Sequence, residues 1–323
     1  MINENTEGFS ATKASKTASG LGYRKLTALG YKRQRNIQRA KVGNMDKPVT
    51  QIIGVASGKG GVGKSTVAVN LAKTLSDAGA RVGLLDADIH GPSIPTLLGT
   101  QGQKPAMDGE LMVPIEYNGL KTMSIGYLVE SKQALVWRGP MLSKAISQFC
   151  TDVKWGELDY LFVDLPPGTG DIHLSLVQTV PLDGAVIVST PQEVALADAR
   201  RGVNMFKLES INVPVIGIIE NMAWFTPAEL PENKYYIFGK EGAKNLASDL
   251  GVPFLGEIPL VQSIREAGDA GRPAALQVAS PIQNSFEELT KNVVQEVVRR
   301  NTALPPTEAI KITTMAGCSA VNE

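Results

Sequence analysis

A glycine-rich stretch in the first quarter of the chain has the residue types and spacing of a phosphate-binding loop. The sequence "GKGGVGKST" at residues 58–66 fits G-x-x-x-x-G-K-[ST] and lies between an apolar strand-like run and a helical pattern. Its glycines let backbone N–H groups converge on phosphate oxygens, and the start of the following helix favours an anion. Lys64 should neutralise the β- and γ-phosphates of a nucleoside triphosphate, and Ser65 should bind Mg²⁺. The predicted nucleotide-binding residues here are Gly58, Lys59, Gly60, Gly61, Val62, Gly63, Lys64, Ser65 and Thr66.

Three aspartates follow or end apolar runs that resemble strands. Asp86 ends such a run in "LLDADIHGPS", and Asp88 follows two residues later, which puts both side chains on the same side of the chain. Asp164 ends "LDYLFVD" and matches the Walker B aspartate that holds Mg²⁺ through water. The alternative that these aspartates cap helices suits Asp171 better than Asp164. Because ligands of parallel sheets bind at the carboxyl ends of strands, we expect these carboxylates beside the phosphates.

The segments that must position these residues predict an α/β fold. From Val49 on, short apolar runs bounded by Gly, Pro or Asp alternate with helical patterns, as buried parallel strands and their crossover helices do. The runs are "QIIGVAS", "RVGLLDAD", "LDYLFVDLPP", "GAVIVSTP", "VPVIGIIE" and "VPFLGEIP". We expect a doubly wound, mostly parallel sheet with helices on both faces. Asn118-Gly119 predicts an inserted hairpin, and residues 281–300 predict a last helix that packs on the core.

Length and composition are those of a globular protein with a basic N-terminal segment. The chain has 323 residues, 43% of them hydrophobic and 20% charged, and no apolar run is long enough to span a bilayer. Residues 1–49 hold ten Lys or Arg against three acidic residues and few apolar ones, which predicts a disordered arm. A solvated tail, a nucleic-acid arm and a transit-like leader are its alternative interpretations. We expect a P-loop ATPase domain at residues 50–300 and a tail at 301–323.

A second lysine in the glycine-rich loop, Lys59, is more than a phosphate loop needs. With it the loop resembles the deviant Walker A superclass, G-K-G-G-x-G-K-[ST], which includes MinD, ParA, the nitrogenase iron protein and Mrp/ApbC-type iron–sulfur carriers. The resemblance implies that Lys59 reaches the nucleotide of a second subunit, so that hydrolysis depends on a homodimer; the alternative is a solvated loop lysine. It also implies that Asp88 activates the attacking water, that Asp86 lies close to the Mg²⁺ shell and that Asn221 contacts adenine. Lys59, Lys64 and Asp88 are therefore the predicted catalytic residues.

Longer motifs indicate which member family of this superclass the chain resembles. The stretches "WGELDYLFVDLPPGTGD", "LLDADIHGPSIPTLLG", "VWRGPM", "VSTPQEVALADARRGVNMF" and "GEIPLVQSIREAGDAGRP" together are similar to Mrp/ApbC-type proteins over about residues 50–300. This resemblance implies a dimeric ATPase that carries an iron–sulfur cluster, commonly [4Fe–4S], and passes it to apo-proteins. The family's small N-terminal domain is not matched, because residues 1–49 are too short and too polar to form it.

The segment "NMAWFTPAELPENKYYIFG" at residues 221–239 departs from that family. The family has a C-x-x-C pair shortly after the Asn-Met dipeptide, and one pair from each subunit gives a cubane its four thiolates. This chain keeps both ends of the segment but has no cysteine in it. Trp224, Phe225 and Tyr235 stand there instead, and its carboxylates Glu229 and Glu232 are poor ligands for a soft cluster. We expect a surface loop that is no cluster site and that contacts a second subunit or a client protein.

The two cysteines of the chain bear on whether it can hold an iron–sulfur cluster and on the compartment in which it works. Cys150 and Cys318 cannot form a disulfide framework, which indicates a reducing compartment, the cytoplasm. Cys150 ends the helical pattern "MLSKAISQFC" and is expected to be a buried structural residue. Cys318, six residues from the end, is the remaining candidate cluster ligand, with a regulatory or functionless thiol as the alternative.

Three functions follow from these observations. The leading hypothesis is a homodimeric, Mg²⁺-dependent ATPase that binds iron–sulfur clusters and transfers them to apo-proteins, with neither membrane nor nucleic acid as partner. The alternative is a ParA/MinD-like nucleotide switch that positions a partner or binds DNA without a cluster. A third possibility is a partner-binding module in which the aromatic segment docks a client and ATP sets the dimer state.

Overall fold

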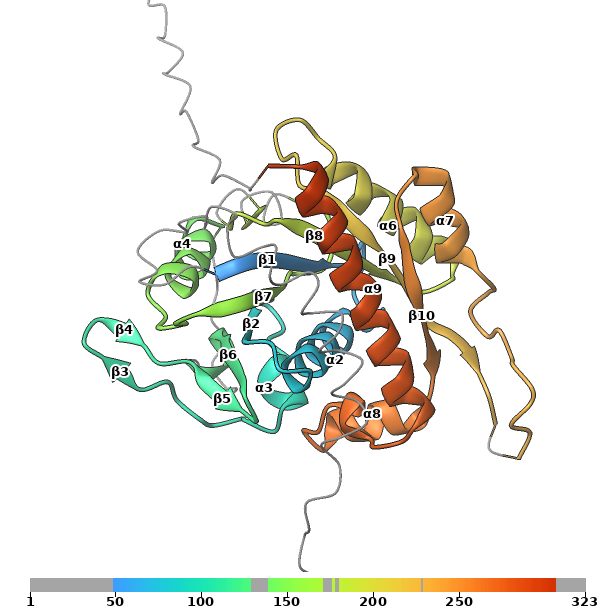
Figure 1. Ribbon diagram of the computed structural model, residues 1–323, viewed down its shortest axis with the longest axis horizontal. Coiled ribbons are helices and arrows are strands. Elements are labelled where there is room, and N and C mark those ends of the chain that lie inside the picture. Colours follow the sequence, from blue (N-terminus) through green and yellow to red (C-terminus); the bar gives the residue numbers. More distant parts are fainter. Residues whose placement is uncertain (1–48, 129–138, 171–175, 178–179, 228, 306–323) are drawn as a thin grey trace, which may run out of the picture. The chain divides into compact units, whose positions relative to one another are not determined.

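The computed structural model of the chain describes residues 49–305, except residues 129–138, 171–175, 178–179 and 228 (Figure 1). The basic N-terminal segment, residues 1–49, lies outside these residues apart from Val49, and so do Asp171 and Cys318. What the sequence indicates for them stays a prediction.

Within the described chain, eight strands form one sheet in the order β10-β9-β8-β1-β7-β2-β6-β5 (Figure 1). The strands are β1 (Val49–Ala56), β2 (Val82–Asp86), β5 (Ile115–Tyr117), β6 (Leu120–Ser124), β7 (Leu158–Asp164), β8 (Gly184–Ser189), β9 (Val215–Phe225) and β10 (Phe254–Leu260). All neighbouring pairs are parallel except β5 and β6. The central strands β7 and β8 are buried at every residue, as their continuous apolar sequences require. The expected mostly parallel α/β sheet is confirmed.

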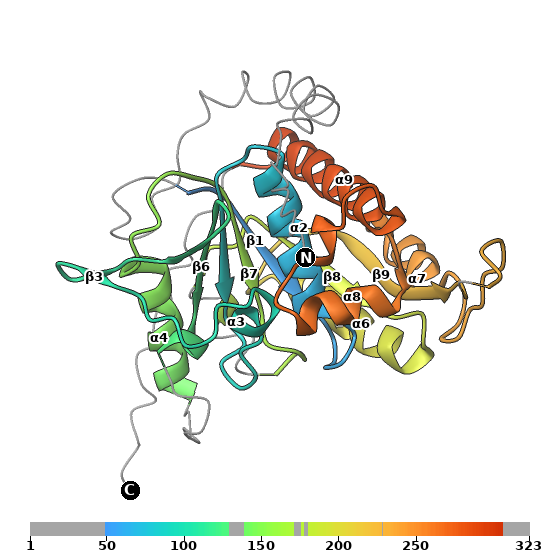
Figure 2. The same cartoon turned by 90° about the horizontal axis from the view of Figure 1, so that it is seen from below.

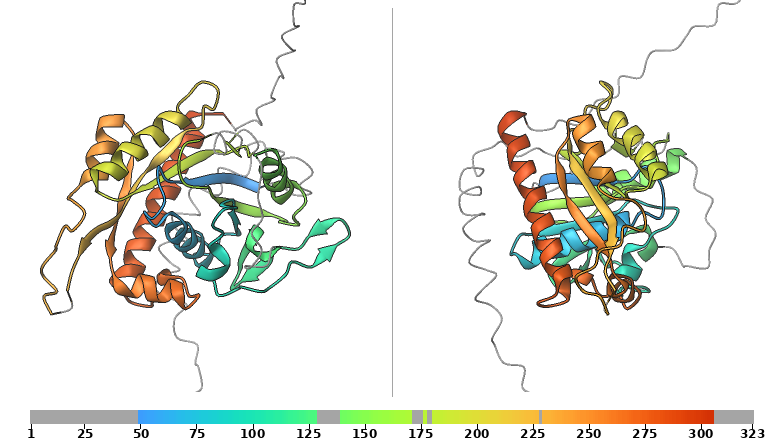
Figure 3. Two further views of the ribbon diagram at one scale, coloured as in Figure 1. Left: turned by 180° about the vertical axis from the view of Figure 1, so that it is seen from behind. Right: turned by 90° about the vertical axis from the view of Figure 1, so that its right-hand side faces the viewer.

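Helices lie on both faces of this sheet (Figures 2 and 3). The longer helices are α2 (Lys64–Asp77), α4 (Gly139–Thr151), α6 (Glu193–Phe206), α7 (Gly242–Leu250), α8 (Gln262–Asp269) and α9 (Pro281–Ala303). Helices α2 and α9 pack together on one face, while α4, α6 and α7 cover an apolar core on the other. The short elements are α3 (Ile94–Leu97), η1 (Ile125–Tyr127), η2 (Ala274–Leu276) and a small hairpin of β3 (Met107–Asp108) and β4 (Leu111–Met112). The strand ends between these layers carry the predicted site.

The inserted hairpin is present, whereas one predicted loop is partly strand. Asn118 and Gly119 turn between β5 and β6 with φ of 45° and 84°, the left-handed values that favour this dipeptide in tight hairpins. Strand β9 was expected to end before Asn221, but it continues to Phe225. Phe225 pairs with Leu260 of β10 on one side and with Tyr235 on the other. These partners are distant in sequence, so the local pattern could not reveal them.

The last helix and the first cysteine lie in the core as expected. Helix α9 buries Ile282, Phe286, Leu289, Thr290, Val293 and Val297. It continues to Ala303, three residues into the segment predicted as a tail, because no helix breaker precedes Pro305. Cys150 is 3% exposed, and burial raises the pKa of its thiol to about 12. None of the helices in the described ranges is long and apolar enough to cross a membrane.

Candidate nucleotide site

The loop that joins β1 to α2 is shaped by two close contacts. A Cβ atom on Gly58 would lie 2.2 Å from the backbone of Asp198 in α6, so glycine is required there. Gly63 precedes α2 with a left-handed φ of 83°, and a Cβ atom on it would lie 2.2 Å from the Asn221 side chain. The Asn221 amide donates to the Val62 carbonyl at 2.8 Å. Helix α6 and the end of β9 therefore fix the loop at the start of α2, where N–H groups attract anions.

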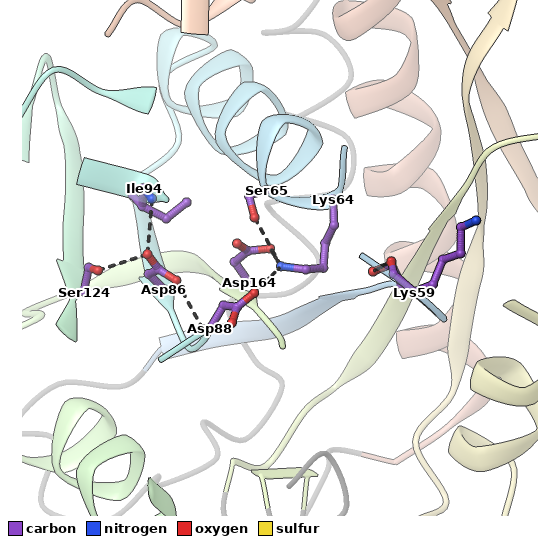
Figure 4. Close-up of polar contacts among 9 residues, drawn as sticks. Lys59, Lys64, Ser65, Asp86, Asp88, Ile94, Ser124 and Asp164 are labelled. Atoms are coloured by element: carbon purple, nitrogen blue, oxygen red, sulfur yellow. Dashed lines mark hydrogen bonds and ion pairs between the residues drawn. The ribbon is translucent and has the colours of Figure 1, made fainter. Parts of the chain in front are cut away.

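Four predicted side chains meet beside this loop, at the carboxyl ends of β2 and β7 (Figure 4). The Lys64 ammonium donates to Asp164 Oδ1 at 2.6 Å and to Ser65 Oγ at 3.2 Å. Asp88 Oδ2 lies 3.9 Å from the same ammonium. Lys64 is 6% exposed and Asp164 is fully buried, so each charge depends on the other for compensation. The structure thus brings together groups that the sequence spreads over 101 positions, from Lys64 to Asp164.

Asp164 is suited to hold a metal ion through water. Burial raises the pKa of its carboxyl, and the Lys64 charge opposes that rise. Its second oxygen, Oδ2, is buried and accepts no hydrogen bond from the part of the chain that the structure describes. A buried carboxylate oxygen without a donor fits a hydrated Mg²⁺ site, with the Ser65 hydroxyl as its neighbour. The residues present therefore fit the metal that the phosphate loop implies.

Asp86 is fully buried and receives hydrogen bonds from three groups (Figure 4). Its Oδ1 accepts from the Asp88 N–H at 3.2 Å, and its Oδ2 accepts from the Ile94 N–H at 3.2 Å. The Ser124 hydroxyl donates to the same Oδ2 at 2.9 Å. Burial and the neighbouring Asp164 charge raise the pKa of Asp86 to about 8. Asp86 thus lies in the predicted cluster, and its oxygens are engaged by the segment that follows β2 and by the end of β6.

Lys59 stands apart from the other predicted catalytic residues. It is half-buried, and its side chain points away from Lys64 (Figure 4). The loop around it is ordered by local contacts: the Ser57 hydroxyl donates to the Lys59 carbonyl at 2.9 Å. The Gly168 N–H, in the loop after β7, donates to the Ser57 carbonyl at 2.9 Å. The loop after β7 is therefore tied to the entrance of the phosphate loop.

Two supporting residues were missed in the sequence. Ser124 ends β6 and holds Asp86. Glu220, near the end of β9, is 1% exposed, and its carboxylate accepts from the Ala243 N–H at 2.6 Å, at the start of α7. A polar residue that closes an apolar strand-like run is the one signal that could have found them, since such positions lie at the ligand-binding edge of a parallel sheet.

The aromatic segment has a different character. Its first five residues extend β9, and residues 224–239, here called the arm, run from the last two residues of β9 out of the sheet and back toward α7 (Figure 1). Phe225 and Tyr235 exchange two backbone hydrogen bonds of 2.8 Å, and the Lys234 ammonium lies 3.9 Å from the centre of the Trp224 ring. Large side chains on the arm are 40–59% exposed, namely Leu230, Tyr235, Tyr236 and Ile237. In the described ranges no three His, Cys, Asp or Glu residues gather as a metal site.

Comparison with known proteins assigns the chain to a family. Residues 48–294 match the family described as the ParA, NUBPL iron-transfer P-loop NTPases, which is about three-quarters of the chain. The chain belongs to this family. The resemblance of this NUBPL-type NTPase to Mrp/ApbC-type carriers, inferred from its motifs, is confirmed.

Relatives of this NUBPL-type NTPase are named as iron-sulfur proteins. The iron-sulfur cluster carrier protein of Synechocystis sp. is 50% identical over 246 residues, 75% of this chain and 69% of the relative. The iron-sulfur cluster transfer protein NUBPL of Dictyostelium discoideum is 46% identical over 252 residues, 77% of each chain. A third relative, from Arabidopsis thaliana, is named an iron-sulfur protein required for NADH dehydrogenase, mitochondrial, and is 49% identical over 76% of this chain and 79% of its own.

Solved structures agree on the fold. A nucleotide-binding protein of Archaeoglobus fulgidus in complex with ADP is 39% identical, with a TM-score of 0.65 over 75% of this chain and 93% of that chain. The septum site-determining protein MinD of Pyrococcus horikoshii, complexed with Mg-ADP, has a TM-score of 0.57 over 77% of this chain and 98% of that chain. At 21% identity this second likeness shows the fold alone.

Proposed function

We propose that this NUBPL-type NTPase hydrolyses ATP as a homodimer, binds iron–sulfur clusters and transfers them to apo-proteins. The observation that carries this proposal is the family match over residues 48–294. The same segment holds the buried ion pair of Lys64 and Asp164. The names of relatives at 46–50% identity support the cargo, and the ADP complex of the 39% identical archaeal protein supports the nucleotide.

In the proposed reaction, the phosphate loop and Lys64 hold the β- and γ-phosphates. Asp88 orients the water that attacks the γ-phosphorus, and the bond from that phosphorus to the bridging oxygen breaks, releasing ADP and phosphate. When bound near Ser65 and Asp164, Mg²⁺ supplies charge neutralisation for the phosphate oxygens. The predicted contact of Asn221 with adenine is part of this proposal, and its bond to Val62 already ties that residue to the phosphate loop.

Lys59 completes the site from a second copy of the chain in this proposal. Its side chain points away from the Lys64 cluster of its own chain, as a group that serves another subunit would (Figure 4). A cation supplied in trans makes hydrolysis depend on the dimer, in the manner of an arginine finger. Residues 50–300 form the domain that dimerises.

The cluster is cargo, and its thiolate ligands come from outside the arm. Iron–sulfur clusters are held by thiolates, and the arm has no cysteine. Cys150 is buried with a raised pKa, so it is a poor ligand. Cys318 is then the chain's remaining thiol. Two copies of Cys318 in a homodimer give half of the four ligands of a cubane, and the apo-protein or a small thiol supplies the rest.

The proposed compartment is the cytoplasm, because a single thiol available for a cluster must stay reduced. The mitochondrial matrix is a second reducing compartment, and the name of the Arabidopsis relative includes the word mitochondrial. A tagged full-length chain followed by cell fractionation distinguishes the two.

Cluster transfer tests the function. The chain is reconstituted anaerobically with iron and sulfide and mixed with an apo-ferredoxin, and the ferredoxin spectrum is followed with ATP, with ADP and without nucleotide. Transfer that ATP changes in the wild type but not in Lys64→Met supports the proposal. A chain that binds and hydrolyses ATP but never loads or transfers a cluster would favour the nucleotide-switch alternative instead.

A further inference from the structure

We propose that Asp86 and Ser124 form a positioning pair that fixes the loop carrying Asp88. The loop comprises residues 87–93, between β2 and α3; Asp88 is its second residue, and Ile94, the first residue of α3, follows it (Figure 4). This inference rests on the proposed ATP hydrolysis, because it assigns a role toward the group that orients the attacking water. It gives Asp86 a task other than holding Mg²⁺ directly.

One carboxylate holds both ends of the loop. Oδ1 of Asp86 accepts from the Asp88 N–H, and Oδ2 accepts from the Ile94 N–H, each at 3.2 Å. Closing a loop through a single buried group removes its freedom to shift, and Asp86 is itself fully buried. The Asp88 carboxylate is thereby kept 3.9 Å from the Lys64 ammonium. Small displacements of a reacting group lower turnover strongly, so a fixed loop matters for Asp88.

Ser124 in turn fixes the orientation of Asp86. The two residues face each other in the parallel register of β2 and β6. The Ser124 hydroxyl accepts from the Gly126 N–H at 3.0 Å and donates to Asp86 Oδ2 at 2.9 Å. Because the Gly126 N–H occupies its acceptor side, the hydroxyl proton is directed at Asp86. Ser124 is fully buried, so water does not compete for this bond.

The turn after β6 also supports the loop by packing. A Cβ atom on Gly126 would lie 3.1 Å from Pro95 and 3.3 Å from Pro92, so η1 lies directly against the loop and the start of α3. The end of β6 therefore touches the Asp88 loop through a hydrogen bond and through close contact. Both carboxylate oxygens of Asp86 are thus occupied by donors from the protein itself, as expected of a group that positions a loop.

Kinetics with a matched control tests the pair. Ser124→Ala and Asp86→Asn should each lower kcat by about 10- to 100-fold, as losses of supporting hydrogen bonds do, and leave KM for ATP within about twofold. Mn²⁺ affinity, measured by electron paramagnetic resonance with ADP present, should stay within about twofold. Thr122→Val is the control: Thr122 is equally buried on β6, but its hydroxyl bonds Tyr127 and the Ile115 carbonyl. It should keep the wild-type kcat.

Amide hydrogen exchange gives a readout that needs no turnover. Exchange of the Asp88 and Ile94 amides should speed up in Ser124→Ala and stay unchanged in Thr122→Val. Mn²⁺ affinity that falls in step with kcat, or loop exchange that is unaltered in Ser124→Ala, overturns the inference. Equal losses of kcat in Thr122→Val overturn it too. A wild-type chain that binds ATP without hydrolysing it overturns the proposed ATPase, and the exchange data still decide whether the pair orders the loop.

Discussion

The nucleotide site and the arm both lie beyond the carboxyl ends of strands of one sheet, but they are built in opposite ways. In the nucleotide site charged side chains are buried, with Lys64 6% and Asp164 0% exposed. On the arm apolar side chains are exposed, with Ile237 at 59%. Buried charges are costly unless each has a partner, so the residues of the first site specify one another. An exposed apolar side chain costs little, so the arm's partner is not specified by the chain itself. The candidate nucleotide-binding side chains are thus fixed by contacts within the fold, whereas contacts within the fold do not determine the partner of the arm.

The largest expected effect concerns the buried lysine of the nucleotide site. Lys64→Met should abolish ATP binding and hydrolysis, because it removes the cation that faces the phosphates and leaves Asp164 uncompensated. Isothermal titration with ATP and phosphate release measure both. Lys73→Met is the matched control, since Lys73 is also buried on α2 but pairs with Asp77. ATP binding that survives Lys64→Met, or is lost equally in Lys73→Met, contradicts the assignment.

The second effect separates binding from turnover. Lys59→Ala should keep ATP binding but lower hydrolysis by about a thousandfold, the lower end of the range for cations supplied in trans. Mixing it with Asp88→Asn gives heterodimers in which one site has both groups. An equal mixture should recover about a quarter of wild-type activity, because half of the dimers are mixed and each has one working site. No recovery on mixing indicates a lysine that acts within its own chain.

A smaller effect on ATP hydrolysis is expected from substitutions in the arm. Trp224→Ala with Phe225→Ala should leave ATP hydrolysis within about twofold, since the partners of these residues are Lys234, Leu260 and Tyr235. Binding to an apo-ferredoxin, measured by biolayer interferometry, should weaken by about tenfold or more if these rings anchor the client. Leu208→Ala, which removes a 50% exposed side chain on another surface, is the control. Unchanged client binding in the arm variant would remove the arm from the contact surface.

The smallest effect is expected at Cys150. Because burial raises the pKa of its thiol to about 12, Cys150 stays a thiol at pH 8 and reacts slowly with alkylating agents. Iodoacetamide should therefore leave Cys150 unmodified in the folded chain and label it in guanidinium, as peptide mass spectrometry can check. Cys150→Ala should lower Tm by about 3 °C and leave iron binding unchanged. Fast labelling of Cys150 in the native chain contradicts its burial.

The grouping of side chains at the candidate nucleotide site was predictable from the sequence because its signals are local. The phosphate loop, Asp86, Asp88 and Asp164 each follow a strand-like run, and a parallel sheet brings such ends together. The hairpin at Asn118-Gly119 was equally readable, since the turn itself requires those residue types.

What stayed hidden depends on contacts between distant segments. Asn221 holds the Val62 carbonyl from 159 positions away, and Phe225 extends β9 by pairing with Leu260. Ser124 belongs to no motif, and its role appears only once β6 lies beside β2. Periodicity describes one segment at a time, so such pairs were beyond its reach.

Iron and sulfide content after anaerobic reconstitution tests most directly whether the cluster is held away from the arm. Wild type, the Trp224→Ala/Phe225→Ala variant and Cys318→Ser are compared, together with absorption near about 400 nm, where thiolate-bound iron absorbs. The account predicts that the arm variant loads as much iron as wild type and that Cys318→Ser loses it. Iron lost with the arm variant, or equal loading in Cys318→Ser and wild type, would contradict it.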